Sequence, residues 1–370
     1  MTEAHDMTGE RIGVAVLGTG FGQKIHIPGL QAHHRTQLVA VYHRDLAKAQ
    51  AIAAQYQIPH ACDTLAQVLA LPEVDVVSIA TPPFLHLEMA IAALTADKHI
   101  LIEKPTALSV QEAQQIEALA QQRQRVATMD FEFRFVPAWQ QLQALLASGY
   151  VGNLRLVKVD WMVPGRADPA RAWSWYARQD QGGGALGAFA SHTFDYLAWL
   201  FGPAQRLCAN LTTAIPQRPD PVTGTLKPVD ADDTCTLMLE LAGGVPGQVT
   251  ISSVTYGGRG HWLEVYGDRG TLVLGSDNLK DYVHGFKLFG AAAGEALQEL
   301  PIPERLAFPK TYDDGRLAPF IRVVDHWVNN IDQGISHAPS ITEGVYSQLM
   351  MDLAHNAHQR RAWVDVPQKP

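Results

Sequence analysis

Between residues 11 and 129, apolar residues are concentrated in short, almost wholly apolar runs separated by longer stretches with helical periodicity. The runs are IGVAVLG, QLVAVYH, VDVVSIA and HILIE. Strands read this way when both of their faces are covered, as in a parallel sheet with helical crossovers. Asp45 stands before LAKAQAIAAQY as a helix cap, and Thr64 precedes Gln67 by three residues, which is capping-box spacing. The pattern predicts a doubly wound Rossmann domain of the α/β class.

After Asp130 the pattern of apolar positions changes. Pro137 begins a predicted helix through WQQLQALLAS, and the runs NLRLVKVDWMV, CTLMLEL, GQVTISSV, HWLEVYG and GTLVLG then alternate apolar with polar positions. Such alternation predicts a large, mostly antiparallel sheet in a second, α+β domain. Residues 213–233 are rich in proline and turn residues and predict a long loop, whereas ITEGVYSQLMMDLAHNAHQRR predicts a closing amphipathic helix.

These patterns divide the chain into three parts. We expect a flexible tail at 1–10, a Rossmann dinucleotide-binding domain at 11–129, and a substrate-binding and oligomerisation domain at 130–370. A length of 370 residues fits two domains better than one.

Composition and charge narrow the classes of partner. The formal charge of -8 disfavours nucleic acid and anionic lipid. Three cysteines far apart in sequence match neither a disulfide framework nor a zinc site, so we predict no metal centre. No apolar stretch is long enough to cross a bilayer and the first residues contain no signal-peptide core, so we expect a cytoplasmic protein without membrane contact.

The first apolar run leads directly into a glycine-rich turn and then a helix. In dinucleotide-binding folds such a turn lets the backbone approach a pyrophosphate, whose charge is met by free amides at the helix start. The third glycine stands one position earlier than in the usual pattern, and an ordinary strand-to-helix turn is the alternative. We predict that the cofactor is bound by Gly18, Gly20, Phe21, Gly22 and Gln23.

The second run ends at Tyr42, His43 and Arg44. NAD enzymes usually carry an acid at this place for the ribose hydroxyls, and none occurs before Asp45. A guanidinium would favour the extra phosphate of NADP through a charge-assisted contact. We therefore predict cofactor contacts for His43 and Arg44 and favour NADP over NAD, with a solvated arginine as the alternative.

Two further segments stand at the carboxyl ends of predicted strands, where open α/β sheets bind ligands. Ala80, Thr81 and Pro82 follow one of them, and His86 lies one turn into the next helix. We predict that these four residues line the nicotinamide side of the cofactor. For His86 the alternative is a helix-surface or satisfied core histidine.

The tripeptide Glu103-Lys104-Pro105 ends the last of the four runs. A lysine in a partly buried pocket can have its pKa lowered from about 10.4, which suits it to exchange a proton with a substrate hydroxyl. Glu103 could orient that lysine or the cofactor amide. The alternative is a surface ion pair ahead of a proline turn.

Taken together, these segments resemble the Gfo/Idh/MocA oxidoreductases. The glycine turn, ATPP with His86, and EKP occur in the order and spacing of that family. The second half resembles it in FEFRFVPAW (131–139), SGYVG (148–152), QGGGALGAFASHTFD (181–195) and YGDRGTLVL (266–274). The resemblance implies a Rossmann domain plus a domain with an open-faced sheet, hydride exchange with a sugar, polyol or related substrate, and a homodimer or homotetramer formed through that sheet.

By this resemblance, Lys104 matches the catalytic lysine and His192 the histidine that many members use as acid or base. Many polyol dehydrogenases of the family have an aspartate four residues before the histidine, where this chain has Ala188, so a full Lys/Asp/His relay is in question. Asp195 is retained, as a substrate residue or a structural partner.

Arg134 is predicted to contact the cofactor, with an interdomain salt bridge as the alternative. Trp175 and Tyr176 could form a wall for a sugar face or could pack the interior.

The function that follows is a nicotinamide-dependent dehydrogenase or reductase acting on CH–OH groups of a carbohydrate-like small molecule, with Lys104 as proton donor or acceptor. Two other functions remain open. One is a dinucleotide-binding regulator without catalysis. The other is an enzyme with tightly held NAD that oxidises its substrate transiently during epimerisation, elimination or glycoside cleavage.

Overall fold

The computed structural model describes residues 11–278 and 283–367, so the predicted tail at 1–10 lies outside the described residues. Within them the chain forms two compact units. Unit 1 contains residues 11–103, 114–130 and 320–342, and unit 2 contains 104–113, 131–319 and 343–367. The sequence-based boundary near 130 is one of several places where the chain passes from one unit to the other. Each unit is described by itself below.

Unit 1 is built on a six-stranded parallel sheet with the strand order β3-β2-β1-β4-β5-β6. This order is that of a Rossmann fold and confirms the predicted doubly wound domain. The strands are β1 (Ile12–Leu17), β2 (Thr36–Tyr42), β3 (His60–Cys62), β4 (Val76–Ile79), β5 (His99–Ile102) and β6 (Ala127–Met129). The sequence analysis did not identify β3 and β6, because three residues are too few for a periodic signal.

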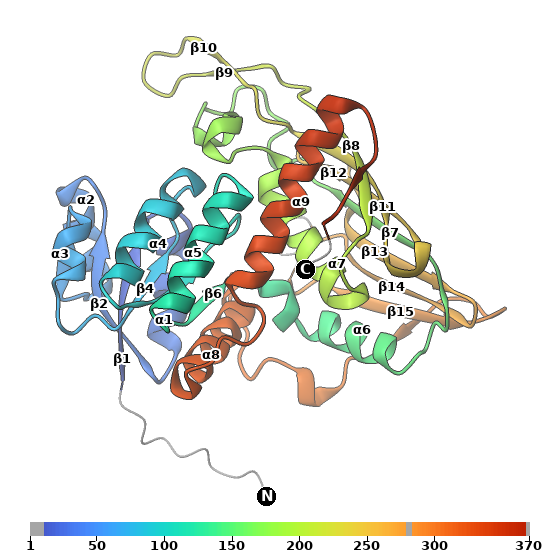
Figure 1. The fold of residues 1–370 in the computed structure, drawn as a ribbon, viewed down its shortest axis with the longest axis horizontal. Helices are drawn as coiled ribbons and strands as arrows, with labels where there is room; N and C mark the ends of the chain where they lie inside the picture. Colours follow the sequence, from blue (N-terminus) through green and yellow to red (C-terminus); the bar gives the residue numbers. More distant parts are fainter. Residues whose placement is uncertain (1–10, 279–282, 368–370) are drawn as a thin grey trace, which may run out of the picture. The chain divides into compact units, whose positions relative to one another are not determined.

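Helices pack on the strands of this sheet, as Figure 1 shows for the blue and cyan part of the chain. Their starts follow the predicted signals. Asp45 caps α2, accepting from the amides of Ala47 and Lys48, and Thr64 and Gln67 form a complete capping box on α3. The helical segments are η1 (Gly22–His26), α1 (Ile27–Ala32), α2 (Leu46–Tyr56), α3 (Leu65–Leu69), η2 (Pro83–Leu85), α4 (His86–Thr95), α5 (Val110–Gln122) and α8 (Leu317–Gln333). Residues 110–113 of α5 and 317–319 of α8 belong to unit 2.

Unit 2 contains a nine-stranded sheet with the order β16-β15-β14-β13-β7-β12-β11-β8-β17 among the described residues. Only β7 and β12 pair in parallel, and the other neighbours are antiparallel, which confirms the predicted sheet. The strands are β7 (Leu154–Met162), β8 (Arg206–Thr212), β11 (Thr234–Glu240), β12 (Pro246–Ser252), β13 (Gly260–Gly267), β14 (Gly270–Ser276), β15 (Lys287–Ala292), β16 (Gln298–Leu300) and β17 (Val364–Asp365).

One face of this sheet forms the core of unit 2. Cys235, Leu237 and Leu239 of β11 point into the core, whereas Thr236 and Met238 are exposed, so the strand alternates as predicted. The helical segments of unit 2 are η3 (Glu132–Phe135), α6 (Pro137–Ala147), η4 (Trp175–Ala177), η5 (Gln179–Gln181), η6 (Leu186–Ala190), α7 (Ser191–Phe201), η7 (Ala242–Gly244), η8 (Glu304–Leu306) and α9 (Ile341–Arg360), whose first two residues belong to unit 1. The closing helix is therefore confirmed.

The segment predicted as a loop at 213–233 contains a short hairpin of β9 (Gln217–Pro219) and β10 (Leu226–Pro228). The interpretation as an unbroken loop was wrong, because the prolines stand at the ends of the short strands rather than inside a longer ladder. Arg218 of β9 is buried and donates to the carbonyl oxygens of Arg166 and Asp168, which fastens the hairpin to unit 2.

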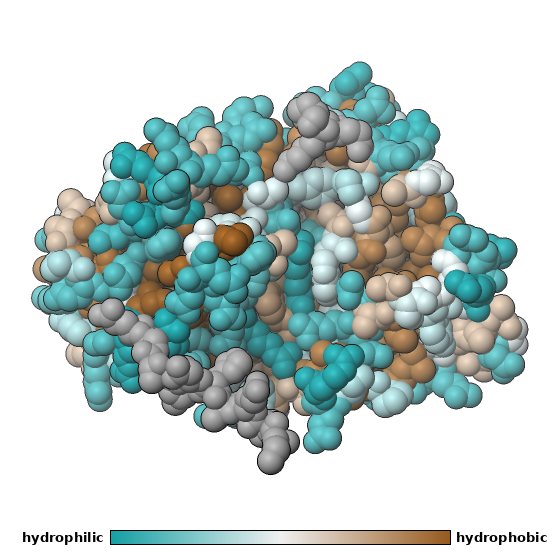
Figure 2. Space-filling view, turned by 60° about the horizontal axis from the view of Figure 1, so that its bottom comes forward, coloured by the Kyte–Doolittle hydropathy of each residue, from teal (hydrophilic) through white to brown (hydrophobic). Residues whose placement is uncertain are grey.

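Figure 2 shows one face of the molecule, with hydrophilic side chains over much of it and apolar side chains in separate patches. No helix among the described residues combines the length and the apolar character that a membrane crossing needs.

Candidate functional site

The glycine turn of unit 1 leaves room that side chains would fill. Gly18 has φ +107°, and a Cβ there would lie 2.4 Å from the carbonyl oxygen of Ala80. At Gly20 a Cβ would meet nothing within 4 Å, so the backbone borders open space. The helical segment η1 begins at Gly22 and continues into α1, and free amides at such a start attract phosphate. The turn therefore fits a dinucleotide pyrophosphate.

Gly22 explains the unusual spacing of the third glycine. A Cβ at this position would stand 3.2 Å from Cβ of Ala80 and 3.3 Å from Cγ1 of Val16. In the usual pattern the third glycine permits close packing of the helix on the strand. Gly22 meets the same need one position earlier, where η1 is a π-helical turn.

After the end of β2, the carboxylate of Asp45 binds backbone amides of the next helix. One carboxylate oxygen of Asp45 accepts from the amides of Ala47 at 3.0 Å and Lys48 at 3.3 Å. The side chain of His43 is tied to the backbone of Asp45. Arg44 is exposed and has no carboxylate within salt-bridge distance in the described part of the chain. The end of β2 therefore presents a cation where an NAD enzyme usually presents an acid.

The loop after β4 is held by the histidine that follows it. His86 is fully buried at the start of α4, and its Nε2 lies 2.8 Å from the carbonyl oxygen of Thr81. The hydroxyl of Thr81 donates to the sulfur of Met89 at 3.5 Å. The imidazole thus fixes the conformation of the predicted nicotinamide loop, and a direct contact between His86 and the cofactor stays a prediction.

A buried polar cluster lies beneath the carboxyl edge of the unit 1 sheet. Nδ1 of His26 is 2.7 Å from the hydroxyl of Ser78, and its Nε2 is 3.0 Å from Glu103 and 3.7 Å from Asp130. The ring of Phe320 covers the imidazole at a centroid distance of 4.4 Å. The sequence analysis missed His26, because nothing near it in sequence indicates partners on three different strands.

This cluster could offer three ligand atoms within 4.8 Å of one another to a cation. The hydrogen bond between His26 and Glu103 accounts for their approach without one. If Nε2 donates to the carboxylate, Nδ1 accepts from Ser78, and both ring nitrogens are satisfied. The cluster therefore orients Glu103, which directly precedes Lys104.

In unit 2, Lys104 begins the segment that packs against the glycine-rich stretch at 181–187. The peptide bond between Lys104 and Pro105 is cis. A Cβ on Gly187 would stand 3.6 Å from Cγ of Pro105, and a small cavity of about 50 Å³ lies between the two segments. Its lining includes Leu108, Gly183 and His355. The segment after Lys104 therefore packs beside η6, the helical turn that leads to His192.

His192 stands in the first turn of α7 among aromatic rings. It is 5% exposed and makes edge-to-face contacts with Phe133 at 4.9 Å and Phe131 at 6.1 Å between centroids. Ala188, one turn earlier, has its amide bound to the carbonyl of Gly184. The position that holds an aspartate in many polyol dehydrogenases therefore supplies no side-chain acceptor to the imidazole.

Arg134 and Asp195 bind each other. The guanidinium donates from Nε at 2.9 Å and from Nη2 at 2.6 Å to the two carboxylate oxygens, and both side chains are buried. Such a bidentate pair is a strong structural link between η3 and α7. The structure thus brings together two residues that the sequence analysis assigned separately to cofactor and substrate, and both assignments stay predictions.

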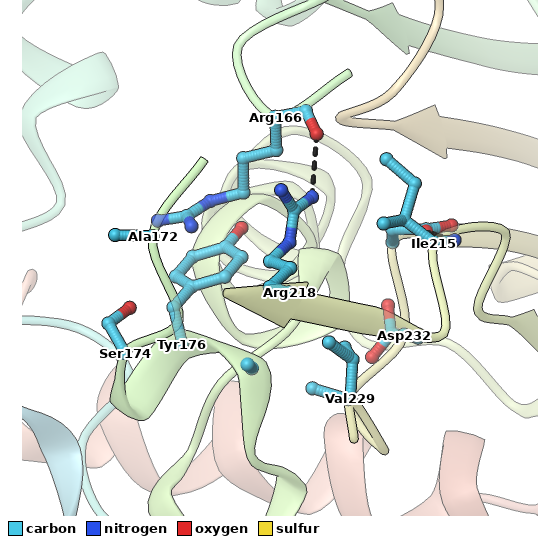
Figure 3. Close-up of a pocket in the computed structure, with 11 residues that line it drawn as sticks. Arg166, Ala172, Ser174, Tyr176, Ile215, Arg218, Val229 and Asp232 are labelled. Atoms are coloured by element: carbon cyan, nitrogen blue, oxygen red, sulfur yellow. Dashed lines mark hydrogen bonds between the residues drawn. The ribbon is translucent and has the colours of Figure 1, made fainter. Parts of the chain in front are cut away.

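Trp175 and Tyr176 lie in η4, with ring centroids 5.7 Å apart. Figure 3 shows Tyr176 in a small pocket of unit 2, with the guanidinium of Arg166 stacked on its ring at 3.1 Å. The cavity measures about 20 Å³, which is room for about one water molecule. Burial lowers the pKa of Arg166 to about 10 and raises the pKa of Asp232 to about 7. This pocket by itself does not accommodate a sugar.

A second histidine of unit 2 escaped the sequence analysis. His261 of β13 stacks on Trp161 at 3.9 Å with an angle of 5°, and its Nε2 is 3.1 Å from the hydroxyl of Tyr196. Burial lowers the pKa of His261 to about 3, so the ring is neutral at physiological pH. In sequence it is only an inward position of an alternating strand.

Comparison with known proteins defines the class. The family described as "Oxidoreductase family, NAD-binding Rossmann fold" matches residues 12–131, and the companion "Oxidoreductase family, C-terminal alpha/beta domain" matches residues 143–366. The fold and the glycine turn thus define an NAD-binding oxidoreductase. Because the two matches span most of the sequence, the chain belongs to the Gfo/Idh/MocA family.

Individual relatives agree with this membership. An uncharacterized oxidoreductase of Synechocystis sp. is 57% identical over 368 residues, which cover 99% of this chain and 98% of that protein. Levoglucosan dehydrogenase of Pseudarthrobacter phenanthrenivorans is 29% identical over 80% of this chain and 81% of its own length. A structure of levoglucosan dehydrogenase in complex with NADH and levoglucosan superposes with a TM-score of 0.88 at 25% identity, covering 97% of this chain and 100% of that chain.

Proposed function

We propose that the chain transfers a hydride between a nicotinamide dinucleotide and a CH–OH or carbonyl group of a sugar, polyol or similar small molecule. The observation that carries the proposal is the glycine turn, whose missing side chains at Gly18 and Gly20 match the needs of a pyrophosphate. Levoglucosan dehydrogenase, a relative over four fifths of the chain, has a structure with NADH and levoglucosan bound, which supports a carbohydrate substrate.

In this reaction the dinucleotide, when bound, supplies the acceptor or donor of the hydride. Lys104 takes the proton from the substrate hydroxyl during oxidation and returns it during reduction. Glu103 is kept in one orientation by His26, and this fixes the backbone immediately before the lysine. Lysine is suited to the task because its amine can hold or release one proton without other covalent change.

His192 assists by positioning the substrate or sharing the proton. Its ring lies among those of Phe131, Phe133 and Trp161, and this packing holds the imidazole in place. Without an aspartate at position 188, a hydrogen bond from the imidazole to a substrate oxygen is the role that fits best.

The test of this proposal is Lys104→Ala. We expect turnover on a panel of sugars and polyols to fall by about 10²–10⁴-fold, whereas the Kd for the dinucleotide stays within about twofold. The change in nicotinamide absorbance measures turnover, and quenching of tryptophan fluorescence measures binding. Lys310→Ala, on an exposed lysine outside the nine-stranded sheet, is the matched control.

Normal turnover in Lys104→Ala would remove the lysine from the mechanism. A wild-type protein that binds the dinucleotide but reduces none on any substrate would point instead to a regulator. NAD(H) that copurifies with the protein and stays bound in native mass spectrometry, together with product formation without net absorbance change, would favour transient oxidation.

For the cofactor we propose a preference for NADP over NAD. The support is Arg44, an exposed guanidinium beside a capping Asp45 whose carboxylate already serves α2. A charge-assisted contact with the additional phosphate contributes about 1.5–3 kcal/mol, so Arg44→Ala should weaken NADPH binding by roughly tenfold or more and leave NADH binding unchanged. Equal losses for both dinucleotides, or none, would reject the preference.

We also propose that the exposed face of the nine-stranded sheet joins a second copy of the chain, as the resemblance to the family implies. Exposed side chains such as Thr236 and Met238 alternate with core positions along β11. Sedimentation velocity at micromolar concentration should show a dimer or tetramer, and a monomer would reject this proposal.

A further inference from the structure

The amino edge of the unit 1 sheet carries a cavity of about 430 Å³. It lies at the strand starts, whereas the glycine turn follows the strand ends, so the length of the sheet separates the two places. Four cations and three carboxylates line it, together with His99: Arg11, Arg35, Lys98 and Arg125, and Asp75, Asp97 and Asp332. The lining thus holds one more positive than negative side chain, on a protein whose formal charge is -8.

Two of these cations, Lys98 and Arg125, follow turns of the same conformation. After α4, Asp97 adopts φ 58° and the amide of Lys98 donates to the carbonyl of Ala93 at 2.9 Å. After α5, Gln124 adopts φ 54° and the amide of Arg125 donates to the carbonyl of Ala120 at 2.9 Å. Each turn ends its helix with a residue in the left-handed conformation. In each, the cation is the next residue and lies just before a strand.

The register of the sheet brings the two cations side by side. In the pairing of β5 with β6, Ile100 lies opposite Ala127. Continued two residues back, the same offset places Lys98 beside Arg125. Adjacent strands are about 4.8 Å apart, and like charges directly opposite each other are destabilising. An anion between them would turn this repulsion into attraction.

Each of the three carboxylates that line the cavity already has a hydrogen-bond or ion-pair partner. Asp332 accepts two hydrogen bonds from Arg35 at 3.0 Å, and Asp97 pairs with Arg123 at 3.5 Å. One oxygen of Asp75 accepts the amide of Gly13 at 2.8 Å.

Three cations remain without such a partner. In the described part of the chain, Arg11, Lys98 and Arg125 have no carboxylate within 4.0 Å, and the Nε of Arg125 is buried without a hydrogen-bond partner.

His99 adds an oriented donor. Its Nδ1 accepts the amide of Val126 at 2.9 Å, so in the neutral ring the proton sits on Nε2. Burial, with a smaller contribution from Arg125, lowers the pKa of His99 to about 4. The imidazole is thus a neutral hydrogen-bond donor at physiological pH, with its tautomer set by the backbone.

Another explanation for the cations is that they stabilise the ends of α4 and α5, since cations favour helix C-termini. The turn amides already satisfy carbonyl groups there, those of Ala93 and Leu94 on α4 and of Ala120 and Gln121 on α5. The cations are therefore not needed to close the hydrogen bonding of these helix ends.

We propose that this cavity binds the phosphate group of a small phosphorylated metabolite, a phosphate monoester of the size of a sugar phosphate. Lys98 and Arg125 hold the phosphate oxygens, His99 donates to one of them, and Arg11 lies at the exposed rim. The volume is in the usual range for small-molecule sites, about 300–1,000 Å³. The site is separate from the dinucleotide phosphates and independent of the catalytic proposal.

The test measures binding of inorganic phosphate and of glucose 6-phosphate by calorimetry, on full-length protein with NADH in excess, because NADPH itself carries a phosphate monoester. We expect both probes to bind, and the sugar phosphate to bind more tightly than inorganic phosphate. Both affinities should fall at high salt. The double variant Lys98→Gln/Arg125→Gln should weaken both by at least about tenfold, because charge-assisted contacts are lost. Lys310→Gln, which removes one exposed positive charge outside the cavity and outside the sheet, should leave both affinities unchanged.

The proposal is overturned if neither probe binds, or if the double variant binds them as the wild type does. Thermal unfolding tests the other explanation, that the cations only stabilise the ends of α4 and α5. In that case, their removal in the double variant would lower the melting temperature by the same amount with and without phosphate. We expect phosphate to raise the wild-type melting temperature and not that of the variant. These readouts compare variants, so they stand even if the dinucleotide proposal fails.

Discussion

The glycine turn of unit 1 and the buried polar groups of unit 2 are built in opposite ways. In the turn, side chains are absent, since a Cβ on Gly18 would meet the carbonyl oxygen of Ala80 and Gly20 borders open space. In unit 2, polar side chains are buried beside an apolar core, with Arg134 bound to Asp195 and His261 stacked on Trp161. An added side chain would strain the turn at Gly18 or enter the open space at Gly20, whereas in unit 2 the loss of one partner would leave the other unpaired.

The difference shows where each region is vulnerable. A backbone site depends on local conformation, so a small substitution acts through sterics and strain. A buried ionic network depends on mutual compensation, so removing one partner leaves the other charged and desolvated. Stability and ligand binding, measured on the same variants, separate these two kinds of damage.

The largest effect is expected for Asp195→Asn. It leaves the buried guanidinium of Arg134 without its carboxylate, and we expect a loss of about 3 kcal/mol in the free energy of unfolding. Glu299→Gln, which breaks the exposed pair with Lys287, is the control and should cost roughly 0–1 kcal/mol. Urea titrations measure both. A variant as stable as wild type but inactive would make Asp195 a substrate residue rather than a structural partner.

A smaller effect on stability is expected for Gly18→Ala, whose new Cβ would meet the carbonyl of Ala80 in a backbone conformation unfavourable to alanine. We expect a cost of about 1–3 kcal/mol and loss of dinucleotide binding.

Gly20→Ala is the matched control for Gly18→Ala, because its Cβ meets nothing within 4 Å of the protein. It should keep wild-type stability and still bind the dinucleotide more weakly. Undisturbed binding in Gly20→Ala would show that this stretch of backbone does not approach the cofactor.

The smallest effect concerns Asp232 in the pocket of Figure 3. Burial raises its pKa to about 7 in the folded protein, against about 3.9 in the unfolded chain. The folded state therefore binds the extra proton between these values, and stability falls as the pH rises through this window.

In Asp232→Asn this contribution disappears, while the amide oxygen can still accept from the amide of Leu186. Between pH 5 and pH 7 the wild type should lose about 1–2 kcal/mol relative to the variant, measured by denaturation at several pH values. A constant difference across that range would show that Asp232 keeps one protonation state.

Much of the fold could be predicted from the sequence alone. Runs covered on both faces identified β1, β2, β4 and β5, and alternation identified the larger strands of the second sheet. Caps such as Asp45 and Thr64 act within three residues and were read correctly. The strands β3 and β6 and the hairpin of β9 and β10 were missed, because three-residue strands carry no period and owe their pairing to distant neighbours.

The sequence by itself determined the longer elements, the fold class and the glycine turn, because each rests on patterns of residues close together in the chain. Tertiary structure alone decided which side chains meet. His26 reaches Glu103 across 77 positions and Arg134 reaches Asp195 across 61. Lys98 and Arg125 become neighbours only through the register of two parallel strands. Local patterns encode backbone conformation, whereas partnership between distant side chains depends on strand order and packing, which no short stretch of sequence contains.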